Sequence, residues 1–270
     1  MKELINYITS QLLVCYPEDE ARSIAWWIAE EITGLSRTQL QFGYKGTTNF
    51  PNLQTIIDRL LHFEPIQYIF GHTLWCGLDL KLTPATLIPR PETAELVDKV
   101  ERLKVKGERL KVLDIGTGSG CIAIALKKRH PKWQVTGIDI SEEAIEVAKE
   151  NAVRNNVEVE FKIADIFDFN GVFDVVVSNP PYICEKEKST MRPNVLNYEP
   201  GTALFVPDDD PLRFYRHIAQ LHMGKYLFFE INEAYATEME NLLQETHYTD
   251  IQIHNDIYGK PRVIQGRIAE

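Results

Sequence analysis

Two kinds of hydrophobic spacing divide the chain near residue 64. Before that point, apolar residues recur at steps of three and four, as in helices that bury one face. This spacing predicts helices over residues 4–13, 21–32 and 53–61. Pro17 separates the first two, and Gly34 stands where a helix C-cap belongs. These residues show no evident chemistry, so the expected structure is a small helical bundle.

Beyond residue 110 the pattern changes to short apolar runs that alternate with helical segments. Near-continuous apolar strands between helices indicate a parallel sheet that is covered on both faces. The last two strands follow each other across a short link, so an antiparallel pair is expected at one edge of a mixed sheet. Residues 65–84 alternate around Gly77, which suggests a hairpin or an extended linker. The expected strands are residues 111–115, 134–139, 157–163, 173–178, 226–231, 247–254 and 262–268.

A glycine-rich stretch joins the first of these strands to a helix that opens at Gly120. Gly116, Gly118 and Gly120 let the backbone turn sharply and let a ligand approach without a Cβ in its way. The dinucleotide fingerprint G-x-G-x-x-G is not met, because Cys121 occupies the place of its third glycine. Asp114, just before the loop, would repel a pyrophosphate and suits a cationic ligand better.

Polar residues follow the next strands. Asp139 ends the second strand, where a carboxylate accepts both hydroxyls of a ribose in NAD and S-adenosylmethionine sites. The alternative is a solvated acid at a strand end. Asp165, after the third strand, stands where an adenine edge would lie, although a loop-capping acid is nearly as good an interpretation. Ser141 and Thr93 are expected to cap the helices that follow them.

The fourth strand ends in Asn179, Pro180, Pro181 and Tyr182. Proline fixes φ and has no N–H, so the Asn179 side chain and the Pro180 carbonyl would be held at set angles. Two carbonyl oxygens and an aromatic face suit the capture of a planar –NH2 group. The alternative is a proline-rich exit turn with a packed tyrosine. In an open parallel sheet this turn, the glycine loop and Asp139 would share one crevice.

Composition limits the location and the partners. Lys and Arg total 29 against 39 acidic residues, and the net charge of −10 counts against a broad grip on nucleic acid. No apolar run reaches the roughly 18 residues that span a bilayer, and the N-terminus lacks a continuous apolar signal segment. The four cysteines and seven histidines have no metal-ligand spacing. We expect a cytoplasmic protein with free thiols and without a metal.

Several motifs occur together, in order, between residues 65 and 264. They are Pro65–Gly71, Leu87–Thr93, Asp114–Gly120, Asn179–Ile183, Tyr198–Pro200 with Ala203 and Leu204, and Asp256 with Gly259 and Arg262. In this combination the chain resembles the HemK-type protein-glutamine N5-methyltransferases. The resemblance implies an α/β fold, with a Rossmann-like class I methyltransferase domain that has a mixed, mostly parallel seven-stranded sheet. That domain is expected over residues 87–270, after a helical substrate-recognition domain over 1–72 and a hairpin linker over 73–86.

The resemblance also implies the reaction. The donor would be S-adenosyl-L-methionine, with S-adenosyl-L-homocysteine as product, and the acceptor the glutamine of the Gly-Gly-Gln loop in class 1 peptide chain release factors. Neither a membrane nor direct nucleic-acid contact is implied. Asn179, Pro180 and Tyr182 would be catalytic, and with Pro181 they would bind the substrate. The implied cofactor-binding residues are Asp114, Gly116, Thr117, Gly118, Ser119, Gly120, Asp139, Asp165, Ile166 and Asn179.

Departures from the family pattern fall in peripheral loops, at Ala94, Val206-Pro207, Pro211 and Asn232. Three alternatives to the glutamine methyltransferase share some of these features. An adenine-N6 nucleic-acid methyltransferase also uses Asn-Pro-Pro-Tyr, but the negative net charge counts against it. An inactive S-adenosylmethionine-binding adaptor is disfavoured by the intact turn, and a nicotinamide dehydrogenase by the glycine spacing.

Overall fold

The chain forms two compact units in a computed structural model that describes residues 1–43, 50–103 and 109–268. The first unit comprises Met1–Gly71 with Arg192–Tyr198, and the second His72–Met191 with Glu199–Glu270. Each unit has hydrophobic core residues of its own. The hairpin region expected as a linker is grouped with the second unit.

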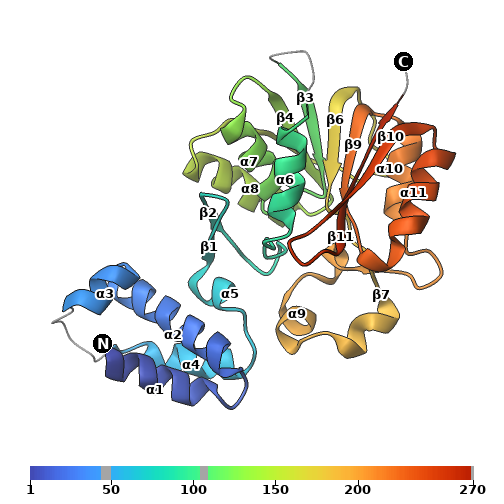
Figure 1. Cartoon of the computed structure of the whole chain (residues 1–270). Helices are drawn as coiled ribbons and strands as arrows, with labels where there is room; N and C mark the ends of the chain where they lie inside the picture. Colours follow the sequence, from blue (N-terminus) through green and yellow to red (C-terminus); the bar gives the residue numbers. More distant parts are fainter. Residues whose placement is uncertain (44–49, 104–108, 269–270) are drawn as a thin grey trace. The chain divides into compact units, whose positions relative to one another are not determined.

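The first unit is helical, as the apolar spacing predicts (Figure 1). α1 (Lys2–Leu12), α2 (Glu18–Thr33) and α4 (Leu53–Leu61) bury their apolar faces in one core. Pro17 precedes α2, and Gly34 ends it with a φ of 67°, a left-handed C-cap that glycine adopts without strain. The unit also contains short helices that were not predicted, α3 (Arg37–Gly43), α5 (Ile66–Phe70) and α9 (Pro193–Tyr198).

The second unit is built on a seven-stranded sheet in the order β10-β11-β9-β6-β3-β4-β5. The pairs from β9 to β5 are parallel, and β11 runs antiparallel to both of its neighbours. The predicted mixed sheet with an antiparallel edge is confirmed, and β5 begins three residues later than expected. The strands are β3 (Lys111–Ile115), β4 (Gln134–Asp139), β5 (Glu160–Ile163), β6 (Phe173–Ser178), β9 (Gly224–Glu230), β10 (Tyr248–Asn255) and β11 (Pro261–Ile268).

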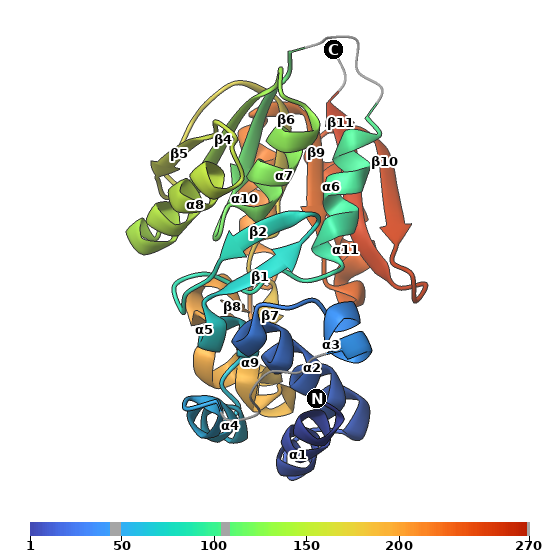
Figure 2. The same cartoon turned by 90° about the vertical axis from the view of Figure 1, so that its left-hand side faces the viewer.

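Helices cover both faces of this sheet (Figures 1 and 2). α6 (Thr93–Glu101), α7 (Cys121–Arg129) and α8 (Glu142–Arg154) bury apolar side chains in one layer. α10 (Arg213–Leu221) and α11 (Ala236–Glu245), which are not among the predicted helices, do so in the other. Within the described ranges, no helix is long and apolar enough to cross a bilayer.

The helix starts that frame the site were predicted with one error. α7 begins directly after Gly120, and the Ser141 hydroxyl accepts the N–H of Ala144 at 3.1 Å at the start of α8. The predicted cap at Thr93 is wrong, because the N-cap of α6 is Glu92 and no side chain caps this helix. The Thr93 hydroxyl instead donates to Glu230 at 2.7 Å, a partner far away in sequence.

The predicted hairpin is present, and it docks on α8 through two asparagines that lie one turn apart. Asn151 Oδ1 accepts the N–H of Lys81 at 2.6 Å, and its Nδ2 donates to the Lys81 carbonyl at 3.0 Å. Asn155 makes the same pair of bonds to the backbone of Asp79, at 3.2 and 2.8 Å. The two side-chain amides thus form hydrogen bonds with the backbone of the hairpin edge in the way that the backbone of a neighbouring strand would. The hairpin strands are β1 (His72–Trp75) and β2 (Leu78–Lys81).

A second small sheet follows the Asn-Pro-Pro-Tyr turn, where β7 (Ile183–Cys184) pairs in parallel with β8 (Phe205–Val206). The chain re-enters the second unit at Glu199, ahead of β8. Short segments of 3-10 helix also occur in the described part of this unit, at Glu185–Thr190, Gly201–Ala203 and Glu233–Tyr235.

Candidate active site

A pocket of about 430 Å³ lies at the carboxyl ends of β3, β4 and β6. Small-molecule sites have volumes of roughly 300–1,000 Å³, and in open α/β sheets ligands bind at this edge. The pocket brings together the predicted glycine loop, the end of β4 and the Asn-Pro-Pro-Tyr turn. Of the predicted site residues, those that line it are Gly116, Gly118, Asp139, Asp165, Ile166, Asn179, Pro180 and Pro181.

The other predicted residues, Asp114, Thr117, Ser119, Gly120 and Tyr182, are not among the lining residues. Thr117 and Ser119 are buried behind the glycine loop, where Thr117 donates its hydroxyl proton to Asp114 at 2.7 Å. Gly120 has a φ of 81°, and a Cβ there would lie within about 3 Å of neighbouring side chains. Asp114, Thr117, Ser119 and Gly120 therefore shape the glycine loop from the side away from the pocket.

Asp114 is completely buried beneath the loop. Burial raises the pKa of its carboxyl to about 7, and hydrogen bonds from Thr117 and Ala123 oppose that rise. Both donors bind Oδ2, whereas Oδ1 has no hydrogen-bond partner among the described residues. An orphaned buried acceptor is compatible with a ligand that brings a proton donor or a positive charge.

The front of the loop is open. Gly116 and Gly118 have φ values of 69° and 54°, and a Cβ built on either meets no atom within 4 Å. Asp139 faces the same space with its carboxylate fixed, because Oδ2 accepts the N–H of Gly118 at 2.9 Å and Oδ1 that of Ser141 at 3.0 Å. Burial raises the pKa of Asp139, and these backbone donors oppose the rise. Each oxygen keeps a lone pair for a hydroxyl of a ligand.

Asp165 lines the pocket and also caps its own loop, since Oδ1 accepts the N–H of Phe167 at 2.9 Å. The structure is compatible with both interpretations offered for this residue. The adjoining Ile166 carbonyl lies 3.1 Å from Nε2 of His217, which ties this loop to α10.

An aromatic wall at this end of the pocket was missed in the sequence. The Arg213 guanidinium lies 5.2 and 5.3 Å from the ring centroids of Phe167 and Phe214, and all three residues line the pocket. Arg213 and Phe214 belong to α10, which was not predicted. The strong apolar stripe of that helix, with Tyr215, Ile218 and Ala219 buried, was the available indication.

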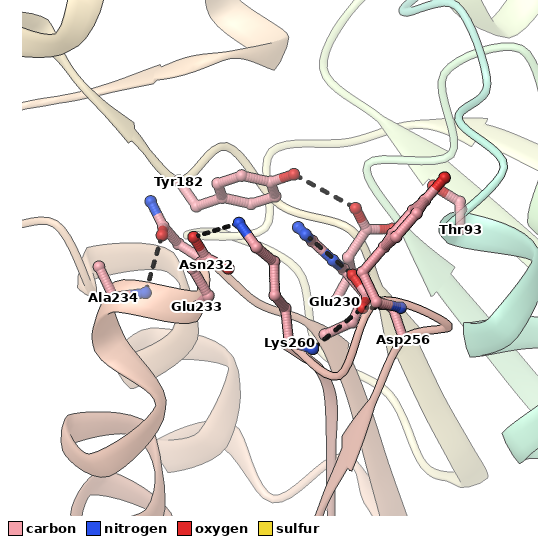
Figure 3. A network of polar contacts seen from close by, with 10 residues as sticks. Thr93, Tyr182, Glu230, Asn232, Glu233, Ala234, Asp256 and Lys260 are labelled. Atoms are coloured by element: carbon pink, nitrogen blue, oxygen red, sulfur yellow. Dashed lines mark hydrogen bonds and ion pairs between the residues drawn. The ribbon is translucent and has the colours of Figure 1, made fainter.

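The Asn-Pro-Pro-Tyr turn is held to the sheet on both sides. Just before it, the Ser178 hydroxyl donates to the Ile115 carbonyl at 2.7 Å and fixes the end of β6 against β3. Asn179 Nδ2 lies 3.5 Å from the Thr93 hydroxyl oxygen. The Tyr182 phenol donates to Glu230 at 3.2 Å (Figure 3). Neither Thr93 nor Glu230 was among the predicted site residues.

A buried carboxylate joins two of the matched motifs. Glu199 accepts the N–H of Ile88 at 3.1 Å and forms an ion pair with Arg90. These contacts link the Leu87–Thr93 motif to the chain just before Pro200. Leu87 and Pro200 both line the pocket, so Glu199 fixes two parts of its wall against each other.

Comparisons with known proteins identify the family. Residues 3–71 match the PrmC N-terminal domain, and residues 94–196 match the methyltransferase small domain. The chain is 42% identical to the release factor glutamine methyltransferase of Bacteroides thetaiotaomicron, with 98% of this chain and 99% of that protein covered. It is 41% identical to the enzyme of that name from Flavobacterium psychrophilum, with 96% and 97% covered. The chain belongs to this family.

The resemblance inferred from the motifs is therefore confirmed, and the protein is an S-adenosylmethionine-dependent methyltransferase. Solved structures agree on the Rossmann-like class I fold. A methyltransferase from Pyrococcus furiosus aligns over 82% of this chain and 100% of its own, with a TM-score of 0.53 at 20% identity. The catalytic domain of hMettl16, in complex with a 3'UTR hairpin, aligns over 72% and 77%, with a TM-score of 0.59 at 17% identity.

One departure from the family pattern has a local explanation. Asn232 stands where the family has a glycine, and its Oδ1 accepts the N–H of Ala234 at 3.0 Å (Figure 3). The side chain thereby caps the 3-10 turn Glu233–Tyr235 at the end of β9. The expectation that the departures lie in peripheral loops is wrong for two of them, because Ala94 lies in α6 and packs against the core, and Val206 is buried in β8.

Proposed function

We propose that this methyltransferase transfers the methyl group of S-adenosylmethionine to the side-chain amide nitrogen of a glutamine, that of the Gly-Gly-Gln loop in class 1 release factors. The single observation that carries the proposal is the position of Asn179 and Pro180. They lie in the wall of the pocket that also contains the glycine loop and Asp139. The names of the family members supply the acceptor.

The residues of the pocket fit the donor. The open face of Gly116 and Gly118 leaves room for a ligand against the backbone, and Asp139 offers two fixed oxygens for ribose hydroxyls. Asp114 lies beneath the loop and outside the pocket lining, where it accepts hydrogen bonds from Thr117 and Ala123 and so fixes the loop from below. Ile166 and Asp165 would bind the base beside the aromatic wall. S-adenosylmethionine, when bound, supplies an electrophilic methyl group.

Asn179 and Pro180 would bind and orient the acceptor. An amide nitrogen is a weak nucleophile because its lone pair is delocalised into the carbonyl. The Asn179 side-chain oxygen and the Pro180 carbonyl can each accept one of its N–H groups, which fixes the direction of the nitrogen. Orientation of this kind can contribute on the order of 7 kcal/mol in well-aligned cases. The same oxygens stabilise the positive charge that develops on nitrogen, and they hold its proton until water removes it.

The proposed substrate is a protein, and the helical unit is the candidate for its recognition. Its residues match the PrmC N-terminal domain, and the unit contains no predicted cofactor or catalytic residue. We assign it the recognition of the release factor. Release factors act during translation, so the proposed reaction takes place in the cytoplasm.

Mass spectrometry of release factor after incubation with the enzyme and labelled S-adenosylmethionine tests the proposal. A mass gain of one methyl on the Gly-Gly-Gln glutamine is expected, with none on a release factor whose glutamine is changed to glutamate. Asn179→Ala should bind the cofactor and lose turnover by a factor of about 100 or more. Unaltered turnover would reject the role of Asn179. Transfer of label to duplex DNA or RNA instead would favour the adenine-N6 alternative.

A further inference from the structure

A buried carboxylate is hydrogen-bonded to Tyr182, the last residue of the turn that we assign to the acceptor (Figure 3). Glu230 is the last residue of β9 and is 1% exposed. Its Oε2 accepts the hydroxyl proton of Thr93 at 2.7 Å, and its Oε1 accepts that of Tyr182 at 3.2 Å. Both oxygens are therefore engaged by hydroxyl donors that come from different elements.

The bond to Glu230 decides which way the Thr93 hydroxyl points. A threonine hydroxyl has one proton and two lone pairs. A carboxylate is a stronger acceptor than a neutral oxygen, so the proton is held by Glu230. Only lone pairs then remain toward Asn179, whose side-chain nitrogen lies 3.5 Å from the Thr93 oxygen.

This arrangement distinguishes between the two orientations of the Asn179 amide. With Nδ2 toward Thr93, the contact is a long hydrogen bond and Oδ1 is free to serve as an acceptor elsewhere. With the amide rotated by half a turn, Oδ1 would face an oxygen that has no proton left to give. The electrostatics therefore favour the orientation that makes the Asn179 oxygen available to bind an –NH2 group.

Tyr182 provides a second, independent connection to the same carboxylate. Burial and the nearby negative charge of Glu230 raise the pKa of its phenol, so the phenol stays protonated and remains a donor. At the backbone of Glu230, the carbonyl accepts the hydroxyl proton of Tyr215 on α10 at 2.9 Å. The end of β9 is therefore fixed from the opposite face of the sheet.

The charge of Glu230 has compensation nearby. Burial raises the pKa of its carboxyl above the ordinary value and the negative charge of Glu92 adds to the rise, whereas the Thr93 and Tyr182 hydrogen bonds and the positive charge of Arg262 oppose it. Arg262 is itself bound to Asp256 at 3.4 Å. Within the family motif Asp256–Arg262, the positive charge of Arg262 thus acts on both Asp256 and Glu230.

The geometry points to Glu230 as a positioning residue that sets the amide orientation of Asn179 through the Thr93 hydroxyl and holds Tyr182 by its phenol. This inference rests on the proposed function, because the exposed Asn179 oxygen has a purpose only if the acceptor is an –NH2 group. Glu230 does not touch the reacting atoms in this role.

Substitutions at Thr93 test the contacts that join Glu230 to Asn179 through the Thr93 hydroxyl, and they leave the Glu230 carboxylate in place. Thr93→Val keeps the shape but removes the hydroxyl, and we expect kcat to fall about tenfold, as for the loss of one net hydrogen bond. KM for release factor and the Kd of S-adenosylmethionine should change by less than about threefold. Thr93→Ser restores the hydroxyl and should recover most of kcat.

Thr136 provides a matched control. Its hydroxyl donates to Glu160 at 3.1 Å on the same sheet, and neither residue lines the site pocket. Thr136→Val should therefore leave kcat at the wild-type value. A fall of kcat in Thr136→Val as large as in Thr93→Val, or equal losses in Thr93→Val and Thr93→Ser, would overturn the inference.

Glu230→Gln completes a double-mutant cycle with Thr93→Val. If both act through Asn179, the double variant should lose little more activity than the worse single variant, whereas independent effects would multiply. The side-chain ¹⁵N–¹H resonances of Asn179 provide a readout that does not depend on the substrate. They should move in Thr93→Val and stay in place in Thr136→Val. If wild-type enzyme does not methylate release factor, the proposed function fails, and these resonances alone decide whether Thr93 controls Asn179.

Discussion

Replacement of Asn151 by alanine should weaken both the fold and the cofactor site. Asn151 is completely buried on α8, and both of its Nδ2 hydrogens as well as Oδ1 are engaged in hydrogen bonds. Besides its two bonds to the backbone of Lys81, Nδ2 donates to the carbonyl of Ser119 at 2.9 Å. Asn151 therefore connects the hairpin to the glycine loop, and Asn151→Ala removes all three contacts.

The loss of unfolding free energy in Asn151→Ala follows from the hydrogen-bond partners that the substitution leaves unpaired. A buried polar group without a partner costs about 1–3 kcal/mol. The Ser119 carbonyl is enclosed, whereas water can reach the partly exposed edge of Lys81. We therefore expect a loss of about 3 kcal/mol in the free energy of unfolding. For a unit of this size, the corresponding fall in Tm is about 6–12 °C.

Denaturant unfolding, together with calorimetric titration of S-adenosylmethionine, measures both consequences. Asn155→Ala is the matched control, because Asn155 binds the hairpin backbone at Asp79 but not the glycine loop. Both variants should lose stability, whereas only Asn151→Ala should bind the cofactor several times more weakly. Equal loss of affinity in the two variants, or full stability of Asn151→Ala, would refute the reasoning.

Three further predictions concern buried groups around the pocket. The free energy of unfolding of the wild-type protein should decline by up to about 4 kcal/mol between pH 4 and pH 7. Asp114→Asn should abolish this decline, and denaturant unfolding across that pH range measures both. Gly137→Ala places a Cβ at 2.7 Å from the Phe161 ring, and overpacking should lower the free energy of unfolding by about 2 kcal/mol in urea titrations. Glu199→Ala leaves Arg90 without its buried partner and should cost about 3 kcal/mol, with Glu199→Gln less affected in the same titration.

The direction of the pH effect follows from the raised pKa of Asp114. Between its ordinary value of 3.8 and about 7, the folded protein binds a proton that the unfolded chain has lost. Stability is therefore greatest on the acidic side of this window and declines as the pH rises through it. Identical pH profiles for wild type and Asp114→Asn would contradict this account. Wild-type stability in Gly137→Ala would show that Phe161 can move aside.

The sheet and the glycine loop could be predicted because their patterns are local. Apolar runs such as Phe173–Ser178 indicate strands by themselves, and the spacing of Gly116, Gly118 and Gly120 indicates a ligand loop before any fold is known. The turn that begins at Asn179 could be predicted as well, because its Asn-Pro-Pro-Tyr pattern is also local in the sequence. Its position in the pocket also follows from a general rule about the carboxyl ends of parallel strands.

Contacts between distant parts of the chain could not be predicted in this way. Thr93 has the residue type and the position of a helix cap, but its hydroxyl is taken by Glu230, 137 positions away. The partners of Asn151 depend on how a hairpin docks on a helix, which no spacing rule contains. α10 was missed although it has an apolar stripe, and with it Arg213 and Phe214 in the pocket wall.

The position of β9 has a consequence for the synthesis of the protein. β9 lies between β6 and β11, and it supplies Glu230 to partners that were translated much earlier. While the chain is still emerging from the ribosome, the glycine loop and the complete Asn-Pro-Pro-Tyr turn exist before the strand that orders them. Strand pairing at such sequence distances is slow. The nascent chain therefore carries the glycine loop and the Asn-Pro-Pro-Tyr turn before it carries Glu230 or the Asp256–Arg262 motif, and we expect it to gain activity only when its last strands have formed.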